Sequence, residues 1–307
     1  MFTTMDREVG DMVTVMERDG NDTGDPKLFG LPVDRDLLFS DHKGRSRRGI
    51  EKRQTKLVGK LAFLKPFLED DEKIVLVTTG CSPTSVLEQV VTGWIVYYLK
   101  RSLIVFTNRR IFHVPAKSDF AYRDSIAEIR YPDCRAIALK RSVLEIRYGN
   151  GTREKFLSID RRERKRIKEM LPGLSLAGEH HNAGGRTHLC PRCTKGLVKD
   201  EYVCPSCRLA FKNLADARRI SILYPGGGYF YTGHPVLGIG DAITELVLMV
   251  LAISSLVEVM SGNGAGYVPL AIWGGALIVE KAISVYHSNH FIREYIPKEK
   301  TVRVLGG

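Results

Sequence analysis

Apolar residues dominate the last third of the chain, where two long runs are separated by a short polar connector. The runs cover residues 236–257 and 267–286, and the connector covers residues 261–266. Each run has the ~20 residues needed to cross a hydrocarbon core about 30 Å thick. We therefore predict a hairpin of two membrane-spanning helices, although a buried hairpin in a soluble protein would give a similar pattern.

Basic residues lie on one side of this predicted hairpin. They precede the first run at Arg208, Lys212, Arg218 and Arg219 and follow the second at Arg293, Lys298, Lys300 and Arg303, whereas the connector has none. By the positive-inside rule, both chain ends then lie in the cytoplasm and the connector lies outside. This predicts an integral protein of the inner (cytoplasmic) membrane with two spans.

Both runs also contain ionisable residues. Asp241 and Glu245 lie one helical turn apart in the first run, and Glu280 and Lys281 lie in the second. Counting about 1.5 Å per residue from each cytoplasmic end places Glu245 and Lys281 at comparable depth. We predict that these two residues pair across the hairpin, which lowers the cost of inserting their charges.

In the first half of the chain, short apolar runs separated by polar turns predict strands. Leu144, Ile146 and Tyr148 alternate with charged residues, which indicates a strand with one buried face. Similar signals predict strands over residues 74–77, 95–99, 103–106, 111–114, 126–131, 136–139, 143–148 and 153–157. Asp160 and Glu163 have the spacing of a capping box and predict a closing helix.

Changes in composition divide this multidomain α+β chain into segments. We predict a disordered N-terminal segment (1–42), a basic arm or helix (43–60), the strand-rich domain (61–172), a linker (173–186), a cysteine module (187–212), the membrane hairpin (213–292) and a basic C-terminal tail (293–307).

Four of the six cysteines form two matched pairs, Cys190-x-x-Cys193 and Cys204-x-x-Cys207. Two residues between the members of a pair allow both thiolates to reach one ion, and two pairs complete a tetrahedral site. We predict a zinc ribbon with a structural Zn²⁺, and iron remains the alternative because rubredoxins have similar pairs. The two other cysteines have no disulfide spacing, in keeping with a reducing compartment.

Residues 103–115 (LIVFTNRRIFHVP) and the strand at residues 122–129 resemble bacterial pleckstrin-homology (PH) and GRAM-like domains. This resemblance implies a PH-like antiparallel β-barrel or sandwich with a C-terminal helix, and a tendency to bind lipid or protein. Residues 224–234 (YPGGGYFYTGH), followed by Gly238 and Gly240, resemble the entry of the TM2 family of two-helix membrane modules.

The formal net charge of +11 favours an anionic partner. If the predicted strands run strictly up and down, several basic residues of the turns gather at one end and form a site for lipid phosphates or another anion. These residues are Lys100, Arg101, Lys117, Lys140, Arg141, Arg161 and Arg162.

The sequence contains no nucleophile elbow, phosphate loop or metalloprotease pair, so we expect no enzyme. We predict a membrane-anchored, cytoplasm-facing adaptor that binds anionic lipid head groups or a protein partner. The alternative is a nucleic-acid-binding or regulatory zinc-ribbon membrane protein, which we rank second because the ribbon itself carries few basic residues. Assembly into a homo-oligomer stays open.

Overall fold

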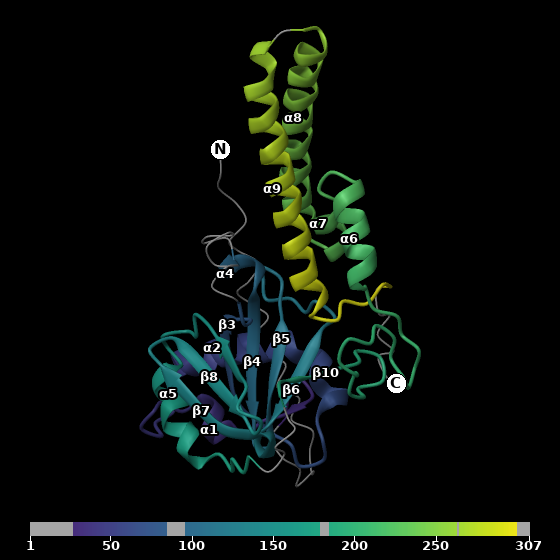
Figure 1. Ribbon diagram of the computed structural model, residues 1–307. Coiled ribbons are helices and arrows are strands. Elements are labelled where there is room, and N and C mark those ends of the chain that lie inside the picture. The colour runs from purple at the N-terminus through teal and green to yellow at the C-terminus, as the bar shows by residue number, and fades with distance from the viewer. Residues whose placement is uncertain (1–26, 85–95, 179–183, 263, 300–307) are drawn as a thin grey trace, which may run out of the picture.

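The computed structural model describes residues 27–84, 96–178, 184–262 and 264–299. A β-sandwich forms one end of the molecule, and a long helical hairpin projects from it (Figure 1). The cysteine module lies beside the sandwich at the base of the hairpin (Figure 1). The mixed α+β architecture expected from the sequence is confirmed.

Two antiparallel sheets form the sandwich. The five-stranded sheet has the order β10-β6-β5-β4-β3 and consists of β3 (Ile74–Cys81), β4 (Arg101–Thr107), β5 (Arg110–Pro115), β6 (Ile126–Arg130) and β10 (Thr187–Leu189). The three-stranded sheet consists of β7 (Cys134–Lys140), β8 (Val143–Tyr148) and β9 (Arg153–Phe156). Side chains of both sheets meet in one core that includes Phe106, Tyr148 and Phe156.

Within the described residues the sheets do not close into a barrel, so the barrel form of the fold prediction is wrong and the sandwich form holds. On one edge, the sheets are joined by a single bridge between Cys81 and Leu157. On the other edge, β6 pairs with β10, which comes from the cysteine module. Since β6 has β5 and β10 as its two neighbours, it cannot also pair with the second sheet.

Short helices complete the sandwich. They are α4 (Val96–Leu99), where a strand was predicted, α5 (Arg164–Met170), and the 3₁₀ turns η3 (Tyr131–Asp133) and η4 (Leu171–Gly173). α5 places Ile167 in the core between the sheets. The predicted capping box is not formed, because the Glu163 carboxylate instead accepts hydrogen bonds from Arg53, Gln54 and Arg166.

Residues 27–42, predicted to be disordered, are ordered. They form β1 (Lys27–Leu28), β2 (Leu31–Pro32) and α1 (Arg35–Phe39), and they bury Leu31, Val33 and Leu38 against the five-stranded sheet. These few apolar side chains are enough to order a segment of polar composition, because each of them is completely buried. Residues 1–26 of the same prediction lie outside the described residues.

The basic segment 43–60 contains helix α2 (Arg48–Val58), which continues into η1 (Gly59–Phe67). Gln54 is fully buried and bonds both the N–H and the C=O of Val77 in β3. We predicted either an arm or a helix for this segment, and the structure shows the helix. The helix is an integral part of the sandwich.

The C-terminal residues after the hairpin are not a free tail. Phe211 and Pro297 form a bridge, and Lys212 N–H donates to the Ile296 carbonyl at 2.9 Å. Tyr295 packs with Leu197, Leu209 and Phe211 in the small core of the cysteine module. We call residues 293–298 the strap, because this segment ties the end of the hairpin to the cysteine module.

The helical part consists of α6 (Leu214–Leu223), α7 (Gly227–Thr232), α8 (Pro235–Met260), η5 (Gly264–Gly266) and α9 (Tyr267–Ile292). α8 and α9 form the hairpin, and α6 and α7 lie against its lower part (Figure 1). The turn before α7 needs glycine at position 226, where φ is +65° and a Cβ would lie 2.1 Å from the Gly238 carbonyl oxygen.

Candidate functional site

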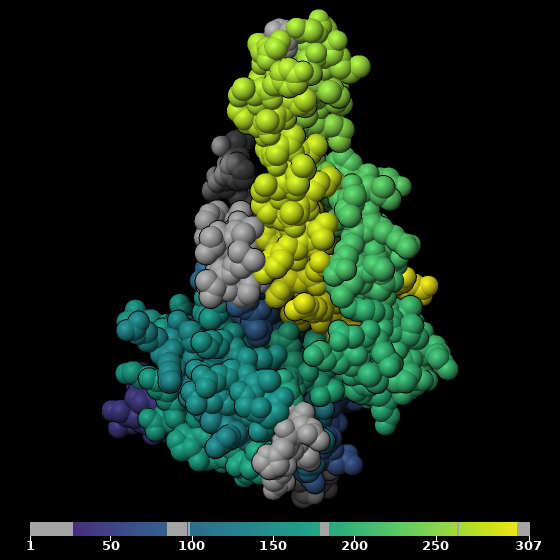
Figure 2. All heavy atoms as spheres, viewed as in Figure 1, coloured from purple at the N-terminus to yellow at the C-terminus, as the bar shows by residue number. Residues whose placement is uncertain are grey.

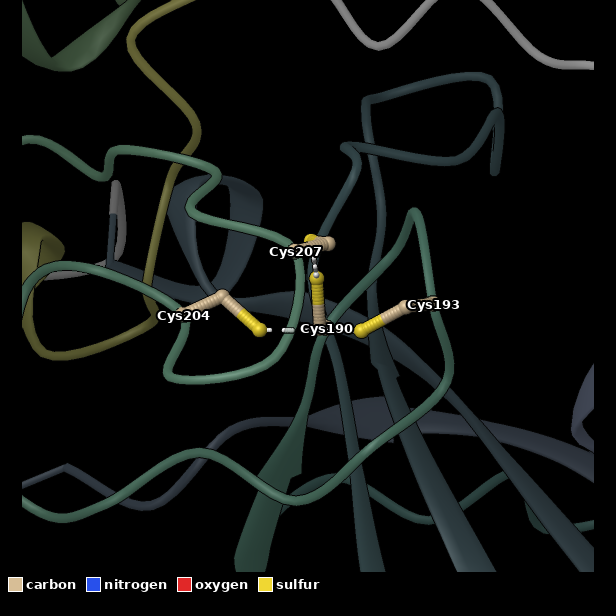
Figure 3. A group of neighbouring side chains, drawn as sticks. All are labelled: Cys190, Cys193, Cys204 and Cys207. Carbon is tan, nitrogen blue, oxygen red and sulfur yellow. Dashed lines mark hydrogen bonds between the residues drawn. The ribbon is translucent and has the colours of Figure 1, made fainter.

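The four cysteines of the cysteine module converge on one point (Figure 3). The Sγ atoms of Cys190 and Cys207 are 3.5 Å apart, those of Cys193 and Cys204 are 3.6 Å apart, and all four lie within 4.8 Å of one another. Sulfurs bound tetrahedrally at about 2.3 Å from an ion would be about 3.8 Å apart. The four thiols therefore lie close enough together to hold one metal ion.

The two cysteine pairs have the same backbone geometry. Thr194 and Arg208 follow the second cysteine of each pair and both adopt positive φ, +62° and +58°. The N–H of Thr194 donates to the Cys190 carbonyl at 2.9 Å, and the N–H of Arg208 donates to the Cys204 carbonyl at 3.0 Å. These tight turns make the two sulfurs of each pair point in the same direction, toward the sulfurs of the other pair.

Peptide groups in these turns favour the metal-binding form of one thiol. Burial raises the pKa of Cys204, but the N–H groups of Cys207 and Ser206 point at its sulfur and bring its pKa down to about 7. The thiolate is the form of cysteine that binds metals.

A buried charged junction joins the cysteine module, the sandwich and the base of α9. Arg186, just before β10, lies 3.2 Å from the carboxylate of Glu294 in the strap. Burial raises the pKa of Glu294, but Arg186 and His188 hold it well below its usual range. Ser125 Oγ donates to the Glu294 carbonyl, so the junction also contacts β6. Because these groups are buried and ionic, they fix how the three parts meet.

The structure brings Glu245 and Lys281 together in the hairpin. Lys281 Nζ lies 2.6 Å from Glu245 Oε2 and also donates to the Ser221 carbonyl of α6 at 2.9 Å. Ligand oxygens of Asp241, Glu245 and Glu280 lie within 4.8 Å of one another, and Ser284 Oγ donates to Asp241 at 3.2 Å. The hairpin thus gathers three carboxylates, of which Glu245 is buried and paired with Lys281.

The seven basic residues predicted to form one anion site lie in three places. Lys100 and Arg101 line a small cavity at the base of the hairpin with Phe291, and Lys117 is in the loop that follows β5 beside Arg101. Lys140 and Arg141 form the turn between β7 and β8. Arg161 and Arg162 line a different cavity.

That second cavity has a volume of about 310 Å³ and is strongly basic. Besides Arg161 and Arg162, its lining includes Arg164, Lys165 and Arg166, together with Asp41, His42 and Ile50. It lies by α1 and α5, on the part of the sandwich remote from the hairpin (Figure 1). Sequence reasoning missed Asp41 and His42 because it treated residues 1–42 as disordered, and it missed Ile50 because it separated the segment 43–60 from the strand-rich domain.

Sequence reasoning also missed a buried ion cluster around Arg110, which lies between the strands predicted at residues 103–106 and 111–114. Arg110 Nη2 lies 2.6 Å from Glu72 Oε2 and 3.0 Å from the Phe67 carbonyl, and Arg110 Nη1 pairs with Glu128. Thr107 Oγ1 donates to Glu72 at 2.7 Å. The cluster closes the end of the sandwich and has a structural role.

Comparisons with known proteins give no family. No protein-family model, no curated protein and no solved structure matches the chain. The interpretation therefore depends on the chemistry of the residues themselves.

Proposed function

We propose that this protein is an integral membrane adaptor whose β-sandwich faces the cytoplasm and binds an acidic protein partner. The hairpin is the anchor, and the cysteine module and the strap hold the sandwich at a fixed position on the membrane surface. The proposal includes no catalytic step.

The apolar surface of the hairpin carries this proposal. α8 and α9 are both long and apolar enough to cross a membrane. Large apolar side chains are uncovered along α8 and the first half of α9, with Val236 82%, Met260 79% and Ile278 72% exposed. A core helix of a soluble protein would bury these side chains, whereas hydrocarbon is a suitable environment for them.

The position of the basic cavity favours a protein partner over a lipid surface. Its side chains lie near α1 and α5, away from the hairpin, so the membrane that holds the hairpin does not reach them (Figure 1). Clustered arginines bind carboxylates through paired hydrogen bonds. An acidic segment of another protein has the matching chemistry.

Membrane integration is tested by alkaline extraction of membranes that contain the full-length protein. We expect the protein to stay in the pellet, because the hairpin is buried in hydrocarbon. Release into the supernatant would contradict the anchor.

The partner is tested with full-length protein in neutral lipid nanodiscs and a labelled Asp/Glu-rich peptide. We expect the paired change Arg161→Gln and Arg162→Gln to weaken peptide binding about thirtyfold, from ~1 kcal/mol for each of the two charge-assisted contacts. The control pair is Arg135→Gln and Arg153→Gln, two exposed arginines of the three-stranded sheet. Equal weakening by both pairs, or binding to anionic vesicles alone, would contradict a protein-binding cavity.

We further propose that the four cysteines hold one structural Zn²⁺. All four ligands come from the protein, which leaves no open position for substrate. Metal analysis of the purified protein should give one zinc per chain and none in a Cys190→Ser and Cys204→Ser variant. Iron in place of zinc would be recognised by its visible absorption and would overturn the assignment.

A further inference from the structure

A third cavity lies at the level where the hairpin begins. It has a volume of about 540 Å³ and is formed by α6, α7 and the strap. Figure 2 shows α6 and α7 in green against the yellow hairpin and directly above the cysteine module. The cavity is distinct from the basic cavity near α1 and α5.

Positive charge in this cavity exceeds negative charge. Lys212, Arg219 and Lys298 line it, and its single carboxylate is Asp216. Lys298 Nζ is paired with Asp216 at 3.1 Å. The other two cations have no carboxylate within salt-bridge distance among the described residues.

Lys212 is half-buried and has only neutral partners. Its Nζ donates to the Tyr231 carbonyl at 2.5 Å and lies 5.3 Å from the centroid of the Tyr231 ring. Burial, with a further contribution from Arg123, lowers the pKa of Lys212. Arg219 is exposed and makes no hydrogen bond with any described residue. An anion between the two would supply the negatively charged partner that neither finds among the described residues.

The remaining walls of the cavity are apolar. Ile220, Phe230 and the Tyr231 ring line it. One turn further along α6, Leu223 and Tyr224 are 70% and 62% exposed. At 1.5 Å per residue, Arg219 and Leu223 are about 6 Å apart along the helix. A ligand with a phosphate at the cations would therefore have its apolar part beside these exposed side chains.

We propose that this cavity, lined by Lys212, Arg219 and Lys298, binds the head group of an anionic phospholipid, whose acyl chains lie along Phe230 and the exposed end of α6. Basic pockets beside membrane helices on the cytoplasmic side are suited to such head groups. The proposal depends on the membrane anchor proposed above, because only an inserted hairpin brings the cavity to the head-group level.

The test uses full-length protein in detergent, titrated with short-chain phosphatidylglycerol or phosphatidylcholine and followed by native mass spectrometry. We expect phosphatidylglycerol to bind at least about tenfold more tightly than phosphatidylcholine, and the pair Arg219→Gln and Lys298→Gln to remove this preference. The matched control is Arg192→Gln and Lys199→Gln, two exposed residues of the cysteine module, which should leave the preference intact.

Three results would overturn the proposal. They are equal binding of the two lipids, equal loss in both variants, and displacement of the lipid by inorganic phosphate alone at the same affinity, which would show that the cavity selects a soluble anion. Failure of the membrane anchor is a separate outcome, because it appears as wild-type protein released by alkaline extraction. If the wild-type protein stays in the membrane on alkaline extraction but shows no preference for phosphatidylglycerol, only the proposed lipid site is contradicted.

Discussion

The sandwich and the hairpin each contain an ion cluster, and the two clusters differ in how completely their groups are paired. In the sandwich, Arg110 pairs with the buried Glu72 and Glu128 and with the partly exposed Glu69, and a hydroxyl and a carbonyl complete the network. In the hairpin, three carboxylates lie within 4.8 Å of one another and Lys281 pairs with Glu245, whereas Glu245 Oε1 and Glu280 Oε2 are buried without a hydrogen-bond partner among the described residues.

The difference shows what each cluster can contribute. A buried ionic network in which every group has a partner fixes a single geometry, and loss of one partner is strongly destabilising. A cluster with excess carboxylates has more acceptors than donors, so removal of one negative charge should be tolerated. The sandwich cluster is therefore expected to be the more sensitive of the two to single changes.

The largest effect should come from Arg110→Met. This change leaves Glu72 and Glu128 buried without their cation, and we expect a loss of about 3–5 kcal/mol in the free energy of unfolding. Denaturant unfolding followed by circular dichroism measures it. The neighbouring Arg109→Met is the control, because Arg109 is 46% exposed and should change stability by less than about 0.5 kcal/mol. Similar small losses in both variants would contradict a structural role of Arg110.

Lys281→Met should be the next most damaging change. It leaves the fully buried carboxylate of Glu245 without its partner, and we expect a loss of about 3 kcal/mol, measured by unfolding of the hairpin in mixed detergent. Addition of Glu245→Gln should restore part of the loss, because the double variant has no unpaired charge at this point. Additive losses would show that the two residues do not interact.

Acid should weaken the sandwich cluster through Glu72. Burial raises the pKa of Glu72, but hydrogen bonds from Arg110, the Glu69 N–H and Thr107 lower it below its ordinary value of 4.5. The unfolded chain then binds a proton at a higher pH than the folded chain does. The stabilisation is present above about pH 4.5 and is lost as the pH falls through the lower, folded value.

Unfolding measured across this acid range tests the effect. Glu72→Gln should reduce the slope of stability against pH, whereas Glu51→Gln, at an exposed side chain of α2, should leave it unchanged. An unchanged slope in Glu72→Gln would show that this residue does not contribute to the loss of stability in acid.

The smallest effect is expected for Glu280→Gln. The amide removes one of three neighbouring negative charges and offers N–H donors to the other carboxylates, so stability should stay within about 1 kcal/mol of the wild type or rise. The same detergent unfolding measures it, with the exposed Glu258→Gln as the control. A loss as large as that of Lys281→Met would contradict the excess of carboxylates.

The contacts that could be predicted from the sequence are those set by spacing alone. The two cysteine pairs and the depth of Glu245 and Lys281 follow from residue counts along a turn or a helix. Arg110 could not be found in this way. Its partner Glu128 comes from the register that pairs Phe112 with Glu128, and Glu72 comes from the loop just before β3, 38 residues earlier.

Contacts between distant segments were missed for the same reason. A strand of three residues, β10, carries no periodic signal, yet it completes the sheet by pairing Leu189 with Ile126. Tyr295 belongs to a basic tail by composition, and only the fold shows that its ring fills the core of the cysteine module. Short segments of this kind are ordered by the surfaces on which they pack.

The strap has a consequence for the order in which the protein is made. Tyr295 and Pro297 complete the core of the cysteine module, but they are synthesised after both helices of the hairpin. Chain synthesis proceeds from the N-terminus, so the module stays incomplete until the hairpin has left the ribosome. The apolar core of the cysteine module is therefore completed only after both helices of the hairpin have been synthesised, whereas its four cysteines are synthesised before them.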